Sequence, residues 1–217
     1  MKKLEIDRRE IYRYLGYRGN EADVATAQLV EQCLEELEQA AEPNIVMKEY
    51  PLAILEDGTI DCGCFQTKSK NLAKNLGGCG RVLLMAATLG LGVDRLLHRY
   101  GKLQMTKAVI LQAASAAMTE AYCNELCRGW AAEYEANGWY LRPRYSPGYG
   151  DFSLDCQQRI LDGLEAGIRL GISLTDGGLM VPTKSVTAVC GISSEKQTCL
   201  VEGCEACEKT ACIYRRR

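Results

Sequence analysis

The segment that most restricts the fold of this chain is residues 81–88, Arg-Val-Leu-Leu-Met-Ala-Ala-Thr. A continuous apolar run of this length is typical of a strand that is buried on both faces of a sheet. Residues 20–42 instead repeat apolar side chains with helical spacing, so we expect a helix there. Residues 106–137 predict a longer helix. Its inner surface is small and lets a neighbouring element approach closely: Ala113, Ala114, Ala117 and Ala121.

The remaining segments alternate between helical and extended patterns. Asp57-Gly58 predicts a hairpin turn within residues 45–61, and Ser69 is a suitable N-cap for a short helix that ends at Leu76. Helices and strands come in mixed order with few strand–helix–strand units, which predicts an α+β domain. The further expected elements are helices at 7–16 and 154–169, the latter capped by Ser153, strands at 172–174, 179–181 and 186–192, and a loop-like segment at 139–153.

The charge balance argues against two classes of partner. The chain of 217 residues holds 26 Lys and Arg against 28 Asp and Glu, a net charge of −2. Because basic residues are not in excess, the chain has no net charge that would attract it to nucleic acids or anionic membranes. We therefore expect neither as a partner. No apolar run reaches the length of about 18 residues that a membrane span needs. His98 is the single histidine, which excludes a metal site with two imidazoles.

The twelve cysteines are the most unusual feature of the composition. No secretory signal is evident, so we expect a cytoplasmic chain whose thiols are reduced and whose cysteine clusters serve metal or redox chemistry. The pattern Cys199-x4-Cys204-x2-Cys207-x4-Cys212 can surround one iron–sulfur cluster or one zinc ion. A disordered tail with free thiols is the alternative. Cys62 and Cys64 are possible additional ligands, and the others are expected to be small buried residues: Cys33, Cys79, Cys123, Cys127, Cys156 and Cys190.

The segment Arg144-Tyr-Ser-Pro-Gly148-Tyr149 is the best candidate for a ligand site. The arginine offers a planar fork that suits a ligand carboxylate. The tyrosine offers an aromatic face that suits a cationic sulfonium or a flat macrocycle. An ordinary loop of proline and glycine residues is the alternative.

Arg144-x-x-Pro147-Gly148-Tyr149 resembles the Arg-x-x-x-Gly-Tyr motif of the activation domain of cobalamin-dependent methionine synthase. The similarity continues through the helix at 154–169 and the stretch Met180-Val-Pro-Thr-Lys-Ser-Val186, and covers about residues 142–191. The resemblance implies a twisted antiparallel sheet flanked by helices over residues 1–192. Residues 193–217 would then form a separate, short cysteine-rich module at the C-terminus.

The resemblance also implies a function. Domains of this family bind S-adenosylmethionine and dock over the cobalamin of methionine synthase, where a methyl group and an electron restore methylcobalamin from cob(II)alamin. Arg144 would hold the methionine carboxylate, the backbone at Gly148 would approach the ligand, and Tyr149 would line the space between sulfonium and cobalt. The chain itself has no cobalamin-binding pattern, so it would act as a stand-alone reactivation factor on a separate corrinoid methyltransferase.

An electron donor such as flavodoxin or ferredoxin would complete that system, with the cysteine module as a possible relay. Two other functions stay open at this point. The chain could be a non-catalytic docking subunit of a corrinoid protein, with structural zinc in its tail. It could also be an S-adenosylmethionine-dependent methyltransferase for another acceptor.

Overall fold

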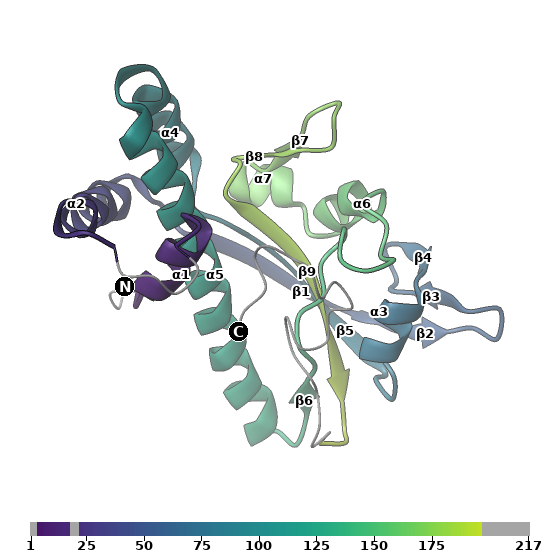
Figure 1. Cartoon of the computed structure of the whole chain (residues 1–217). Helices are drawn as coiled ribbons and strands as arrows, with labels where there is room; N and C mark the ends of the chain where they lie inside the picture. The colour runs from purple at the N-terminus through teal and green to yellow at the C-terminus, as the bar shows by residue number, and fades with distance from the viewer. Residues whose placement is uncertain (1–3, 18–21, 197–217) are drawn as a thin grey trace.

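The computed structural model describes residues 4–17 and 22–196 of the chain (Figure 1). At its centre lies β5 (Arg81–Thr88), which pairs in antiparallel fashion with β1 (Asn44–Pro51) on one side and β9 (Ser185–Ser193) on the other. The short strand β6 (Tyr140–Leu141) completes the sheet in the order β1-β5-β9-β6. All residues of β5 after Arg81 are buried, which confirms the strand predicted from its unbroken apolar sequence.

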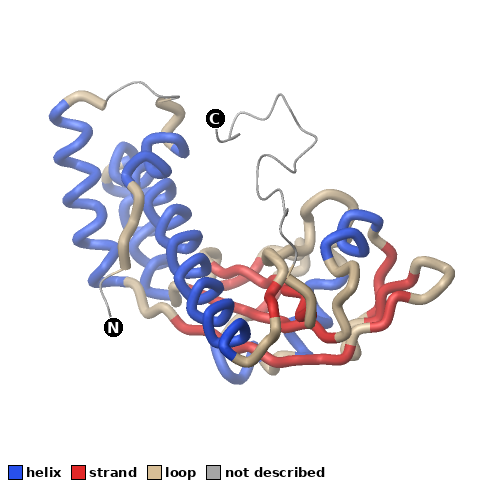
Figure 2. Tube along the Cα trace, turned by 90° about the horizontal axis from the view of Figure 1, so that it is seen from below, coloured by secondary structure: helices blue, strands red, loops and turns tan. Residues whose placement is uncertain are grey.

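One long helix, α5 (Met105–Ala136), packs against the other helices with its first half and against the central sheet with its second half (Figures 1 and 2). The first half of α5 packs against α1 (Arg8–Tyr14), α2 (Val24–Ala40) and α4 (Leu91–Leu103). The second half lies on one face of the sheet. The small residues predicted to face a neighbour do so: Ala113, Ala114 and Ala117 are buried, and Ala121 is half-buried.

Three short helices cover the opposite face of the sheet: α3 (Lys70–Asn75), α6 (Cys156–Gly163) and α7 (Ala166–Leu170). Their apolar side chains pack with alternate residues of β5, while the residues between these point toward α5. The sheet is therefore antiparallel and has helices on both faces. This confirms the predicted α+β class.

The helix predicted over residues 154–169 is divided in the structure. Glu165 separates α6 from α7 and has a left-handed backbone, with φ of 54°. The Gly163 carbonyl, which a continuous helix would use, accepts a hydrogen bond of 2.6 Å from the Tyr50 hydroxyl. The prediction of one helix is wrong because this contact from β1 replaces a helical hydrogen bond. The start also differs: α6 begins at Cys156, and the Ser153 hydroxyl accepts only a local bond from the Asp155 amide.

Two small antiparallel sheets extend from this core. The first is made by β2 (Ala53–Ile54), β3 (Thr59–Asp61) and β4 (Gln66–Lys68). Its first turn is the predicted Asp57-Gly58 turn, in which the Asp57 carboxylate accepts a bond of 2.9 Å from the Thr59 amide. The second is a hairpin of β7 (Ser173–Leu174) and β8 (Met180–Val181), which confirms the strands predicted at 172–174 and 179–181. In the first, β4 lies beyond the extended segment predicted at 45–61.

The ends of α2 are set by local chemistry. The Asp23 carboxylate accepts a hydrogen bond of 2.9 Å from the Thr26 amide, the usual arrangement of an N-cap, so α2 begins later than residue 20. Pro43 cannot continue the helix.

Among the residues that the structure describes, no helix combines the length and the apolar character needed to cross a bilayer.

Candidate functional site

Residues 139–153, expected to be loop-like, follow the edge of the sheet for part of their length. After β6, Tyr145 and Val189 of β9 exchange two backbone hydrogen bonds of 2.8 and 2.9 Å. Neighbouring side chains of an extended segment point to opposite faces. Tyr145 accordingly packs on the α6 side of the sheet, and Arg144 points toward α5.

Arg144 is held by two polar side chains of α5. Its guanidinium donates hydrogen bonds of 2.5 Å to a Glu120 carboxylate oxygen and 2.6 Å to the Asn124 amide oxygen. The Arg144 side chain is 21% exposed and that of Glu120 is 35% exposed. Burial, the largest single influence, acts to lower the pKa of Arg144, but Glu120 together with the neighbouring thiols Cys123 and Cys127 holds this pKa above its ordinary value. The site is therefore a partly buried pair of opposite charges.

Sequence reasoning missed Glu120 and Asn124. A signal for the first was present, since Glu120 is the only charged residue between Ala108 and Cys123. A lone carboxylate in such an apolar stretch needs a partner. Its partner is separated by 24 positions in the sequence, so only the fold reveals the pair.

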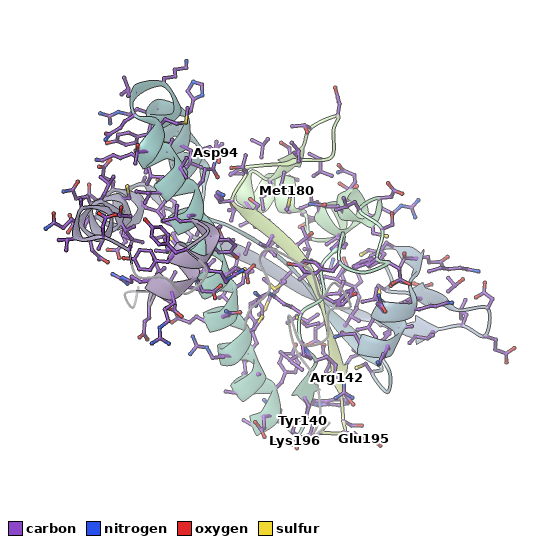
Figure 3. The ribbon with its side chains drawn as sticks, viewed as in Figure 1. Asp94, Tyr140, Arg142, Met180, Glu195 and Lys196 are labelled. Carbon is purple, nitrogen blue, oxygen red and sulfur yellow. The ribbon has the colours of Figure 1, made fainter. Side chains whose placement is uncertain are left out.

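A small open hollow lies beside Glu120. It has a volume of about 180 Å³, and its lining includes Glu120, Tyr14 of α1, and Thr183 and Lys184 from the connection between β8 and β9. Burial lowers the pKa of Lys184. Asp94 of α4, on the side that faces β8 (Figure 3), accepts hydrogen bonds of 2.9 Å from the Thr183 amide and 2.5 Å from its hydroxyl. Glu120 and Lys184, which carry opposite charges, thus line one hollow beside the middle of α5.

Gly148 and Tyr149 lie in a turn beyond Arg144. Gly148 has φ of 90°, a left-handed conformation that favours glycine, and its amide donates a bond of 2.8 Å to the Phe152 carbonyl. Tyr149 is 64% exposed, and its ring centroid lies 6.4 Å from that of Tyr145. The structure thus brings Arg144 to α5 and the Tyr149 ring to Tyr145. Their roles as ligand contacts remain predictions.

The turn is fixed to α3 by one carboxylate. Asp151 accepts hydrogen bonds of 2.5 Å from the Ser69 hydroxyl and 2.7 Å from the Lys70 amide. The Ser69 oxygen in turn accepts from the Leu72 amide at 3.0 Å, as the predicted N-cap of this short helix. The Ser69 hydroxyl lowers the pKa of Asp151. The candidate segment is therefore tied to the rest of the domain at both ends.

Replacing Ser69 with alanine is expected to reduce the free energy of unfolding by about 1–2 kcal/mol, because the N-cap of α3 is lost. The hydrogen bond to Asp151 is lost with it. The pKa of Asp151 is lowered in the folded state, so its contribution is present above its ordinary pKa of 3.8 and is lost as the pH falls through the folded value. Urea unfolding of Ser69→Ala and wild type should therefore differ more at about pH 7 than at about pH 3. An equal difference at both pH values would contradict the role of Asp151.

The cysteine predictions have a mixed outcome. Cys33, Cys123, Cys156 and Cys190 are buried as expected, whereas Cys79 and Cys127 are only half-buried, so for these two the prediction is wrong. Among the described residues, no group of three or more cysteine, histidine or acidic side chains could hold a metal ion. The predicted metal ligands lie outside the described residues and remain a prediction: Cys199, Cys204, Cys207 and Cys212.

Comparison with known proteins identifies a solved structure with a similar fold. Neither a scan against protein-family models nor a search of curated proteins gives a match. Among solved structures, the chain is similar to the MetH reactivation domain bound to AdoHcy, with a TM-score of 0.65 and 19% sequence identity. The similarity covers 88% of this chain and 75% of that one. The chain therefore shares the fold of that reactivation domain, over far more of its length than the motif at Arg144.

Proposed function

We propose that this chain binds S-adenosylmethionine at the Arg144–Glu120 pair and supports the reductive methylation of cob(II)alamin on a separate corrinoid methyltransferase. The observation that carries the proposal is this pair of opposite charges, partly buried beside a hollow. It belongs to a fold that is similar to a domain bound to AdoHcy, or S-adenosylhomocysteine.

The pair suits the amino-acid end of that ligand. S-adenosylmethionine and AdoHcy both carry an ammonium and a carboxylate on one carbon atom. The planar Arg144 guanidinium can hold the carboxylate through two parallel bonds. Glu120, released from Arg144, can accept from the ammonium group. Ligand binding would replace the Arg144–Glu120 pair with two pairs, one between Arg144 and the ligand carboxylate and one between Glu120 and the ligand ammonium. No charge would then be left buried and unpaired.

The hollow indicates how the rest of the ligand would lie. Its volume of about 180 Å³ is less than the roughly 300–1,000 Å³ of sites that enclose a small molecule. Part of the ligand would therefore stay at the surface, within reach of a partner protein. The exposed Tyr149 ring lies beside Tyr145, on the α6 side of the sheet, so it and the backbone at Gly148 would meet only a part of the ligand that extends past the sheet edge. We keep their assignment as ligand contacts within this proposal.

A corrinoid partner completes the function. We propose that the partner is a methionine synthase or a related corrinoid protein, and that a flavodoxin or ferredoxin supplies the electron. S-adenosylmethionine would supply the methyl group to the partner's cobalamin. The cysteines between Cys199 and Cys212 would hold an iron–sulfur cluster or zinc in this scheme.

Ligand calorimetry on the full chain tests the amino-acid end directly. AdoHcy should bind at least about 10-fold more tightly than 5′-methylthioadenosine, which lacks the ammonium and carboxylate, because charged hydrogen bonds contribute about 1.5–3 kcal/mol. Equal affinities would show that the charge pair does not recognise the ligand.

The corrinoid role has a separate test: a methionine synthase should bind the chain more tightly with cob(II)alamin than with methylcobalamin. Equal affinity for the two states would remove the reactivation role.

A further inference from the structure

Two thiols meet where α5 lies on the sheet. Cys127 of α5 and Cys190 of β9 pack in the same apolar cluster. Cys190 is 1% exposed, whereas Cys127 is half-buried. The two thiols lie close enough to interact, and hydrogen bonding between them is the largest influence on the pKa of each.

Arg144 adds a positive charge to this pair. Arg144 and Cys190 flank the backbone bridge between Tyr145 and Val189, so both side chains point toward α5. On α5, Cys127 follows Glu120 and Asn124 at the spacing of one helix face. The guanidinium donates hydrogen bonds to Glu120 and Asn124, and its charge also acts on the Cys127 thiol.

These contacts stabilise the thiolate of Cys127. The bond from Cys190 and the charge of Arg144 lower the pKa of Cys127 to about 7, although burial opposes the change. The same bond and complete burial raise the pKa of Cys190. Cys127 is therefore a half-buried residue whose thiolate is populated at neutral pH, and Cys190 is a protonated thiol beside it.

We propose that Cys127 and Cys190 are a redox pair that hydrogen peroxide converts to a reversible disulfide linking α5 to β9. The Cys127 thiolate attacks one peroxide oxygen and breaks the O–O bond. The hydroxide released takes a proton from solvent, which leaves a sulfenic acid on Cys127. The Cys190 sulfur then attacks the Cys127 sulfur, and the hydroxyl leaves with the Cys190 proton as water. Two thiols, one peroxide and no other reactant give one disulfide and two waters.

The proposal shares Arg144 with the ligand site proposed above but needs no ligand, and the chain contains a matched control. Cys64 is half-buried like Cys127, but burial raises its pKa. Peroxide should therefore react with Cys127 and spare Cys64. Cys123, one turn before Cys127, is buried and has a pKa of about 12. It is therefore a poor competitor for either role.

Peptide mapping of the full chain decides the question. The reduced protein is treated with hydrogen peroxide at about pH 7, blocked with N-ethylmaleimide, digested and analysed by mass spectrometry. We expect a Cys127–Cys190 cross-link that dithiothreitol removes and that Cys64→Ser retains. In Cys190→Ser, dimedone should trap a sulfenic acid on Cys127. Cross-links from Cys127 to any other cysteine, or preferential oxidation of Cys64, would overturn the proposal.

A second readout needs no variant. Iodoacetamide should alkylate Cys127 in the reduced wild-type chain with a rate that rises with pH and is half-maximal near its pKa of about 7. The thiolate is the reactive form, so the rate must increase as the proton is lost. Cys64 should require a pH above the ordinary thiol pKa of 9.0. A common pH dependence for the two thiols would show that Arg144 and Cys190 do not activate Cys127.

Discussion

Replacement of Gly92 by alanine is expected to lower the free energy of unfolding by about 3 kcal/mol, the upper part of the usual range for overpacking. A Cβ atom at this position would lie 2.1 Å from the Ala40 carbonyl oxygen and 3.2 Å from its carbon. Both neighbours are backbone atoms, so no side chain can rotate away. The start of α4 would have to separate from the end of α2, where Val93 and Leu37 belong to the same buried cluster. Urea or thermal unfolding measures the loss.

Gly129→Ala is the matched control for Gly92→Ala. Gly129 lies within α5, is exposed, and has no atom within 4 Å of the position of an added Cβ. Alanine should stabilise the protein here by about 0.5–1 kcal/mol, because glycine is the less favourable residue within a helix. The two substitutions are chemically identical and should have opposite signs. A neutral Gly92→Ala would show that α2 and α4 are less closely packed than in the structure.

Arg144→Ala is expected to weaken the binding of AdoHcy by about 10- to 150-fold, corresponding to about 1.5–3 kcal/mol for a hydrogen bond to a charged group. The affinity for 5′-methylthioadenosine should change little, since that molecule lacks the carboxylate. Arg144→Lys should restore binding only in part, because a lysine ammonium lacks the planar fork. Calorimetry with both ligands separates loss of the carboxylate contact from a general loss of structure.

Arg8→Ala provides the control for this arginine. Arg8 also donates two bonds to one carboxylate, that of Glu31, but both side chains are about half exposed, at 44% and 52%. Its removal should leave AdoHcy affinity unchanged and cost little stability, as is usual for exposed ion pairs. Unchanged AdoHcy affinity in Arg144→Ala itself would remove Arg144 from the ligand site.

The sequence by itself determined most of the local structure. The apolar run of β5, the small-residue face of α5, and the turn at Asp57-Gly58 each depend on neighbours in the chain, and each is found where it was predicted. The N-cap role of Ser69 belongs to the same class, since the serine and the Leu72 amide are three residues apart. Periodicity and capping chemistry are local properties, so they can be read without the fold.

Only the tertiary structure decided which distant residues share an environment. Tyr50 of β1 reaches the Gly163 carbonyl and divides a helix that the local pattern predicts as one. Arg144 was predicted as a site residue, but its contact with Glu120 and the shared cluster of Cys127 and Cys190 follow from the position of α5 on the sheet. The physical reason is that such contacts depend on how layers pack, and burial then changes the charge and reactivity of groups that would be ordinary in an extended chain.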